Sequence, residues 1–152
     1  MKMLENFDSK LTQQMRADIK AQGKTIFDIV RMASIVEAEV PHEADRPMIT
    51  GILWKRLDAG MALQVDSALN YVTAGKNRSL TAEELKIDSP YNTYKYRGLP
   101  PTPIGNPGLS ALRAAIYPTH TAYWYFLSDK DGKTHFAKTL EEHNENKSKY
   151  LR

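Results

Sequence analysis

Hydrophobic residues recur every three or four positions through the first third of the chain, which is the spacing of helices that bury one face. The first such pattern predicts a single packing helix over residues 4–20, within an N-terminal part of residues 1–22, and Gly23 ends it. Its apolar positions are Leu4, Phe7, Leu11, Met15 and Ile19. The polar residues between them indicate that the opposite face meets water.

A second helix is predicted over about residues 26–40. Thr25 and Asp28 have the spacing of a capping box, in which each residue binds the other's backbone N–H. Pro41 marks the end of this helix, because proline cannot continue the helical hydrogen bonding.

The rest of the chain predicts shorter elements. A third helical pattern covers about residues 43–58 and stops at Gly60. Short helices are also expected at residues 68–72, at 82–85 after the cap Thr81, at 109–116, and after Thr139, which pairs with Glu142; the polar turn 75–78 joins the first two.

Near the C-terminus, an aromatic segment at residues 122–127 and a return strand at 133–137 flank the turn residues 129–132. This arrangement predicts a β-hairpin. The chain is therefore expected to be an α+β protein, a mainly helical single domain over residues 1–152 with a small antiparallel hairpin and a long ordered Pro-rich loop.

That loop, residues 90–108, holds five of the eight prolines and three of the eight tyrosines. Each proline fixes its own φ and removes a donor, so the segment can be neither a helix nor an inner strand. A flexible linker or a docking peptide is the alternative, but linkers are usually polar and repetitive. The interleaved tyrosines, asparagines and apolar residues favour a stiff loop that forms the wall of a ligand cleft.

Composition narrows the function classes. The 152 residues are 41% hydrophobic, which is enough for one core, and the net charge of +3 is spread along the chain. The sequence has no zinc-finger spacing, aromatic RNA-binding pattern or basic arm, so nucleic acid is not the expected partner. Without cysteine, and with its four histidines scattered, the chain is expected to hold no metal and no other cofactor.

One carboxylate stands out on the second helix. Steps of three and four residues from Ile26 place Glu37 on the apolar stripe, whereas Glu39 lies about 200° further round and is expected to face water. Burial raises the pKa of a carboxyl group, as a general acid requires. The alternative is that Glu37 forms a buried ion pair with a neighbouring arginine, Arg31, Arg46 or Arg56.

Further polar residues could line a cleft. Gln64 and Asp66 alternate with apolar neighbours and so share one face, although Asp66 alone is better explained as a helix cap than as a site residue. In the Pro-rich loop, amide and hydroxyl groups suit sugar hydroxyls, and tyrosine rings suit sugar faces; these residues are Tyr91, Asn92, Thr93, Tyr94, Tyr96 and Asn106. Local turn bonding and core packing are the competing explanations.

These motifs in this order resemble the YceG-like, or MltG-type, endolytic murein transglycosylases. The resemblance covers about residues 25–150. It rests on the segments Ala33-Ser34-Ile35-Val36-Glu37-Ala38-Glu39, Leu63-Gln64-Val65-Asp66, Tyr91-Asn92-Thr93-Tyr94, Gly98-Leu99-Pro100-Pro101-Thr102-Pro103-Ile104-Gly105-Asn106-Pro107-Gly108 and Glu142-His143-Asn144.

The resemblance implies a lyase that cuts nascent peptidoglycan between N-acetylmuramic acid and N-acetylglucosamine and leaves 1,6-anhydro ends. By motif position it makes Glu37 the catalytic acid and then base. It also implies that the substrate-binding residues are Gln64, Asp66, Tyr91, Asn92, Thr93, Tyr94 and Asn106.

The resemblance also implies where the protein works. The expected site is the extracytoplasmic face of the bacterial membrane, with an N-terminal anchoring helix upstream of this chain, glycan strands as the substrate and peptidoglycan synthases as partners. Two rival interpretations stay open. One is a hydrolase in which Glu37 works with Asp66, and the other is a wall-binding module without catalysis.

Overall fold

The computed structural model describes residues 2–75 and 79–151. At its N-terminus, two helices, α1 (Lys2–Lys10) and α2 (Gln13–Ala21), replace the single helix predicted over residues 4–20. The chain breaks because the Thr12 hydroxyl accepts a hydrogen bond from the Met15 N–H at 3.2 Å and caps a new helix. The predicted stripe is buried on α2 but only in part on α1, where Phe7 packs against the core and Leu4 is 75% exposed.

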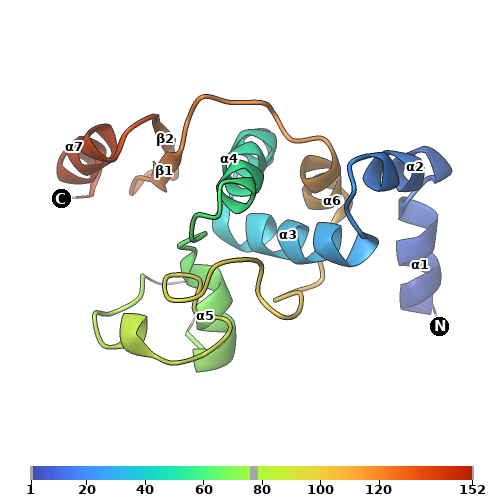
Figure 1. Cartoon of the computed structure of the whole chain (residues 1–152), viewed down its shortest axis with the longest axis horizontal. Coiled ribbons are helices and arrows are strands. Elements are labelled where there is room, and N and C mark those ends of the chain that lie inside the picture. The colour runs from blue at the N-terminus through green and yellow to red at the C-terminus, as the bar shows by residue number, and fades with distance from the viewer. Residues whose placement is uncertain (1, 76–78, 152) are drawn as a thin grey trace.

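Helix α3 (Ile26–Glu39) is the central element of the fold. Its predicted capping box is confirmed, since the Thr25 hydroxyl accepts from the Asp28 N–H and the Asp28 carboxylate accepts from the Thr25 N–H. Helices α2, α4, α5 and α6 all contact it, and Figure 1 shows it running through the middle of the molecule. Consequently α3 is buried on more than one side, at Ile29, Met32, Ala33, Ser34, Ile35 and Val36.

Helices α4 (Arg46–Asp58) and α6 (Leu109–Ile116) pack against α3 and against each other. A 3₁₀ turn, η1 (Glu43–Asp45), precedes α4, so the predicted helix over residues 43–58 is confirmed in two parts. A methyl group at Gly51 would lie 1.9 Å from the Thr119 carbonyl oxygen. The glycine therefore lets the segment after α6 cross close to α4.

A smaller part of the chain lies below α3 in Figure 1. It contains α5 (Asp66–Thr73) and the 3₁₀ turn η2 (Glu84–Lys86), where the sequence predicts helices at residues 68–72 and 82–85. The Thr81 hydroxyl accepts from the Glu84 N–H at 3.2 Å, as a cap would, but the N-cap position of η2 is Glu83. The predicted turn at residues 75–78 lies largely outside the described residues.

The predicted hairpin is confirmed as β1 (Tyr125–Ser128) and β2 (Thr134–Ala137), an antiparallel pair with Phe126 opposite Phe136. The segment before Tyr125 is not part of the strand. Helix α7 (Leu140–Tyr150) begins at the cap Thr139 and packs on both strands, at the end of the molecule opposite α1 and α2 (Figure 1).

Seven helices and one two-stranded sheet among the described residues confirm the predicted α+β class. The Pro-rich loop is ordered and runs beside α3 and α5. Of the helices in the part of the chain that the structure describes, none is long and apolar enough to span a bilayer.

Candidate active site

A cleft of about 580 Å³ lies where five segments meet: the C-terminal end of α3, the end of α4, the start of α5, the Pro-rich loop, and the hairpin with α7. Its lining residues are Ala38, Glu39, Pro41, Arg56, Leu63, Gln64, Asp66, Ser67, Asn70, Ser79, Tyr94, Phe126, Leu127, Ser128, His143, Lys147 and Leu151. Of the residues predicted for a site, this cleft collects Gln64, Asp66 and Tyr94.

Glu39 is the carboxylate that α3 presents to the cleft. The sequence prediction that it faces water is wrong, because Glu39 lies against the start of α5 and its Oε1 accepts from the Ser67 N–H at 2.8 Å. Burial raises the pKa of this carboxyl group, hydrogen bonding by Ser67 opposes the shift, and the nearby charge of Asp66 adds to it. Glu39 thus has the raised pKa that periodicity predicted for Glu37.

Asp66 is held in place from two directions. The Tyr94 hydroxyl donates to its Oδ1 at 2.5 Å, and the Leu80 N–H donates to its Oδ2 at 3.3 Å. Burial and the bond to Asp66 raise the pKa of Tyr94, so this phenol stays a donor. The side chain of Asp66 makes no capping bond to α5, whose N-cap is Val65, so the helix-cap explanation is wrong.

Gln64 adopts a backbone conformation that non-glycine residues rarely use, with φ of 55°. Thr93 holds this geometry, because its carbonyl oxygen accepts from the Gln64 N–H at 3.2 Å and its hydroxyl bonds both backbone groups of Val65. The effect is to direct residues 64 and 66 to the cleft while Val65 is buried.

The opposite wall carries basic groups. Arg56 is 5% exposed and donates to the Trp124 and Leu63 carbonyl oxygens, each at 2.8 Å, which ties α4 to the hairpin segment. His143 and Lys147 come from α7. Burial first, and then the charges of Lys147 and Arg56, lower the pKa of His143 to about 4, so its imidazole is neutral near pH 7.

Glu37 does not line this cleft. Its Oε1 accepts from the Gly108 N–H at 3.0 Å, at the end of the Pro-rich loop. It is half-buried, and among the described residues it forms no ion pair with an arginine. The structure therefore does not bring Glu37 together with the cleft residues or with Asn92.

Two predicted binding residues of the loop face inward instead. Asn92 is fully buried and donates to the Leu85 and Ile87 carbonyl oxygens, each at 2.9 Å. Thr93 is 2% exposed, and its hydroxyl is occupied by Val65. Both side chains are thus committed to backbone hydrogen bonds. Those of Asn92 are local, as the competing explanation had it, whereas Thr93 bonds a distant segment of the chain.

Tyr91 and Asn106 lie outside the cleft lining. The Tyr91 hydroxyl bonds the Thr102 hydroxyl at 2.7 Å, and its ring packs near Tyr71 with centroids 5.6 Å apart. Asn106 is exposed on the second half of the loop. Only the first half of the loop, through Tyr94, reaches the cleft.

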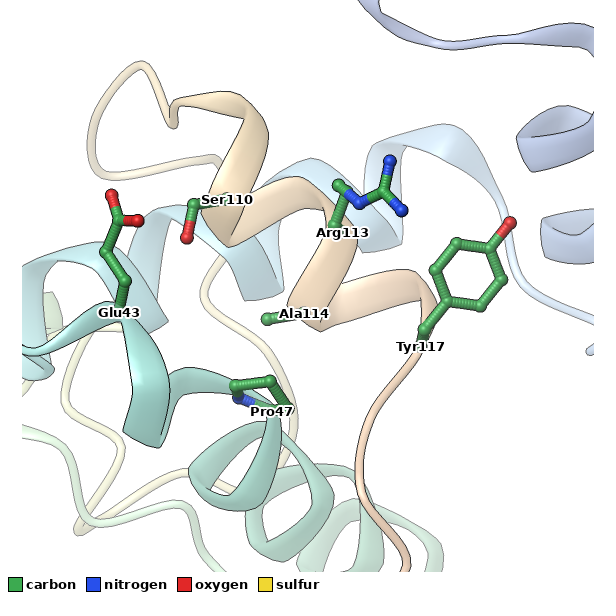
Figure 2. Close-up of a pocket in the computed structure, with 6 residues that line it drawn as sticks. All are labelled: Glu43, Pro47, Ser110, Arg113, Ala114 and Tyr117. Atoms are coloured by element: carbon green, nitrogen blue, oxygen red, sulfur yellow. The ribbon is translucent and has the colours of Figure 1, made fainter.

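A second hollow, of about 500 Å³, lies between the start of α4 and α6. Figure 2 shows its lining residues Glu43, Pro47, Ser110, Arg113, Ala114 and Tyr117. The Glu43 carboxylate and the Arg113 guanidinium do not point toward one another, and Glu43 pairs instead with Arg46 at 3.5 Å. This hollow lacks the buried ionisable groups that mark the larger cleft.

The described residues include no group of three or more His, Cys, Asp or Glu side chains that could hold a metal ion. Sequence reasoning missed Glu39, Arg56, Ser67, His143 and Lys147. A usable signal existed only for Glu39 and His143, which fall inside the motifs that carry the family resemblance. The other three come together only through long-range packing.

Comparison with known proteins gives a consistent result. A sequence model of the YceG-like family matches residues 1–149. The chain is similar to the endolytic murein transglycosylase of Bacillus subtilis, with 42% identity over 137 residues, which cover 90% of this chain and 38% of that protein. The Streptococcus pneumoniae protein of the same name, from strain D39, is 34% identical over 155 residues, covering 98% and 28%.

A crystal structure is also similar, that of a putative yceG-like protein from Listeria monocytogenes. Its TM-score is 0.86 at 39% sequence identity, and the match covers 95% of this chain and 46% of that one. The chain thus spans less than half the length of the relatives that it matches.

Proposed function

Because this chain belongs to the YceG-like family, we propose that it is the catalytic domain of an endolytic murein transglycosylase. Its substrate is a peptidoglycan glycan strand, cut between N-acetylmuramic acid and N-acetylglucosamine. The observation that carries the proposal is Glu39, a half-buried carboxyl group of raised pKa inside an open cleft large enough for sugar residues.

We assign the acid to Glu39, although the motif position implies Glu37. A general acid must be protonated near neutral pH and must reach the substrate. Glu39 has a raised pKa and lines the cleft. Glu37 lies outside the cleft lining and accepts a backbone hydrogen bond from the Pro-rich loop, which is a structural role.

The proposed reaction needs one group in two protonation states. Protonated Glu39 donates its proton to the glycosidic oxygen as the bond to the muramoyl C1 breaks. The Glu39 carboxylate then takes the proton of the muramoyl 6-hydroxyl as that oxygen bonds C1. The products are a 1,6-anhydro end and a new free sugar end, and no water is consumed.

Asp66 supports this cycle as a fixed negative charge. The Tyr94 hydroxyl and the Leu80 N–H both donate to it, which holds its carboxylate in place. The nearby charge of Asp66 raises the pKa of Glu39. It also favours the positive charge that develops at C1 as the glycosidic bond breaks.

A second candidate follows from the same two carboxylates. Ordinary glycoside hydrolases use a carboxyl pair, one member as the acid and the other as nucleophile or base. Glu39 and Asp66 line one cleft, so a hydrolase would use Asp66 to activate water or to attack C1.

Mass spectrometry of glycan fragments separates these possibilities. We expect the purified chain to convert glycan strands to fragments that are lighter by one water than those with reducing ends. Reducing ends would support the hydrolase instead. Glycan binding without fragments would indicate a binding module, and Glu39→Gln provides the control for contaminating activity.

The proposal also concerns location and partners. It places the reaction on the extracytoplasmic side of the bacterial membrane, where peptidoglycan is assembled. The same reasoning makes peptidoglycan synthases candidate partners, because they supply nascent strands.

A further inference from the structure

Ser67 lines the cleft and carries a buried polar group that the described residues leave without a hydrogen bond of standard geometry. It is 8% exposed and lies in the first turn of α5. Its hydroxyl oxygen is buried and has no hydrogen-bond partner among the described residues. A buried hydroxyl without a partner is costly, so its retention in a cleft wall calls for a function.

The backbone of Ser67 places this hydroxyl beside Glu39. Backbone N–H groups in the first turn of a helix have no partner within the helix. The Ser67 N–H uses this freedom to donate to Glu39 Oε1 at 2.8 Å. The hydroxyl is thereby kept near the same carboxyl group, where it lowers the pKa of Glu39, although it forms no hydrogen bond of standard geometry among the described residues.

Other charged and titratable groups surround this pair. Asp66 comes from α5, Arg56 from α4, Tyr94 from the Pro-rich loop, and His143 and Lys147 from α7. Two hydroxyls belong to this surrounding. That of Tyr94 donates to Asp66, whereas that of Ser67 has no partner of standard geometry among the described residues and lies close enough to Glu39 to lower its pKa.

We propose that Ser67 is a positioning residue whose hydroxyl serves both protonation states of Glu39. A serine hydroxyl is one donor and two acceptor sites, and it rotates freely about its C–O bond. It can accept a hydrogen bond from the protonated carboxyl group. It can also donate to the carboxylate once the proton has gone to the glycosidic oxygen, while keeping its own proton throughout.

The catalytic role given to Ser67 rests on the proposed function, because only a carboxyl group that alternates between acid and base needs a partner suited to both states. Its physical content is independent of substrate. A hydroxyl that donates to the carboxylate stabilises the charged form and lowers its pKa, the direction in which Ser67 acts on Glu39.

The test is an NMR titration of the Glu39 side chain in the full chain without substrate. We expect Ser67→Ala to raise the pKa of Glu39 by about one unit, because the hydroxyl no longer stabilises the carboxylate. The variant keeps the backbone N–H, so the change isolates the hydroxyl. Ser67→Thr, which retains a hydroxyl, should return the pKa toward the wild-type value.

Ser128→Ala is the matched control, since Ser128 lines the same cleft from β1; it should leave the pKa of Glu39 unchanged. If Ser67→Ala does not fold, Ser67→Cys keeps the size but has a weak hydrogen-bonding group, and it should raise the pKa in the same direction. An unchanged Glu39 pKa in a folded Ser67→Ala or Ser67→Cys protein would overturn the proposal.

The activity profile gives a second readout. Cleavage by Ser67→Ala should fall about tenfold, and its loss at alkaline pH should occur about one unit higher than in the wild type. The two proposals can fail separately. If the wild-type protein cuts no glycan, the proposed function is overturned; a raised Glu39 pKa in Ser67→Ala would still support the role of Ser67.

Discussion

Helix α3 has two sides with different roles. On one side, three residues spaced three apart hold the second half of the Pro-rich loop: Arg31 donates to the Pro100 carbonyl oxygen, and Ser34 and Glu37 accept from the N–H groups of Ile104 and Gly108, each at 3.0 Å. On the other side, Glu39 enters the cleft beside α5.

The two sides differ in how fully their polar groups are satisfied. On the loop side, the buried Arg31 Nε is the one side-chain atom of the three that lacks a partner among the described residues. The cleft side concentrates irregular features: the raised pKa of Glu39, the positive φ of Gln64, and the unpartnered Ser67 Oγ and His143 Nδ1. Such local conflicts are typical of functional sites, which depart from what the fold alone prefers.

The largest predicted effect separates Glu37 from Glu39. Glu39→Gln should reduce glycan cleavage by about 10²–10⁴-fold, because an amide cannot donate the proton. Glu37→Gln keeps an acceptor for the Gly108 N–H and should retain most of the activity. Rates of release of anhydro fragments, measured for both variants side by side, test the difference.

Measurements of stability show whether a loss of activity in Glu39→Gln comes from unfolding. A carboxyl group with a raised pKa in the folded state destabilises the protein as the pH rises through that pKa, because ionisation is easier in the unfolded chain. The melting temperature of Glu39→Gln should therefore match or exceed that of the wild type at alkaline pH. A Glu39→Gln protein that is well folded and fully active would refute the assignment.

The sequence predicted the helices best where a cap marks an end. Thr25 and Thr139 cap the helices expected to follow them, Thr81 bonds the first residue of η2 without being its N-cap, and α6 has the bounds read from the sequence, 109–116. The N-terminal helix was predicted as one because its apolar stripe continues through the break. Periodicity could not reveal that Thr12 caps a second helix.

The sequence pattern pointed to Glu37 as the carboxyl group of raised pKa, whereas the structure gives that property to Glu39, and the cause of this difference is the packing of α3. The prediction assumed that α3 has one buried face and one solvent-exposed face. However, four helices contact α3, so a residue opposite the stripe can also be buried against another element. Glu39 is covered by α5 and the Pro-rich loop, which are close to it only in the folded chain.

The asparagine and threonine of the loop show a related limit. Amide and hydroxyl side chains suit a sugar and a turn equally well, and the sequence left both explanations open. The choice depends on the neighbouring carbonyl groups of Leu85 and Ile87, which Asn92 binds.

The second prediction concerns the electrostatic effect of Asp66 on Glu39. Asp66→Asn removes a negative charge that raises the pKa of Glu39. The pKa should therefore fall, and cleavage should be lost at a lower pH than in the wild type. Each unit of this shift costs about tenfold in rate at a fixed pH above the pKa.

A pH–rate profile of Asp66→Asn checks this direction. Tyr94→Phe is a milder companion, since it removes only the donor to Asp66. A profile displaced to higher pH in Asp66→Asn would contradict the role of Asp66 as a fixed negative charge.

The third prediction concerns the loop side of α3. Glu37→Ala leaves the Gly108 N–H without its acceptor and should lower the free energy of unfolding by about 1 kcal/mol. Glu37→Gln retains a carbonyl oxygen and should lose less. Urea denaturation of the two variants measures the difference. Equal losses would mean that the charge of Glu37, and not the hydrogen bond, holds the loop.

The smallest effect is predicted at Gln64, where a substitution that favours stability is expected to reduce activity. Glycine adopts a φ of 55° without strain, but it loses more backbone entropy on folding, so Gln64→Gly should gain only about 0.5 kcal/mol of stability. The same change removes an amide from the cleft and should lower kcat/KM for glycan cleavage. A gain in stability with a loss of activity identifies strain that is kept for function. If both quantities fell together, Gln64 would belong to the supporting structure, as Glu37 does, and the contrast between the two sides of α3 would be weaker.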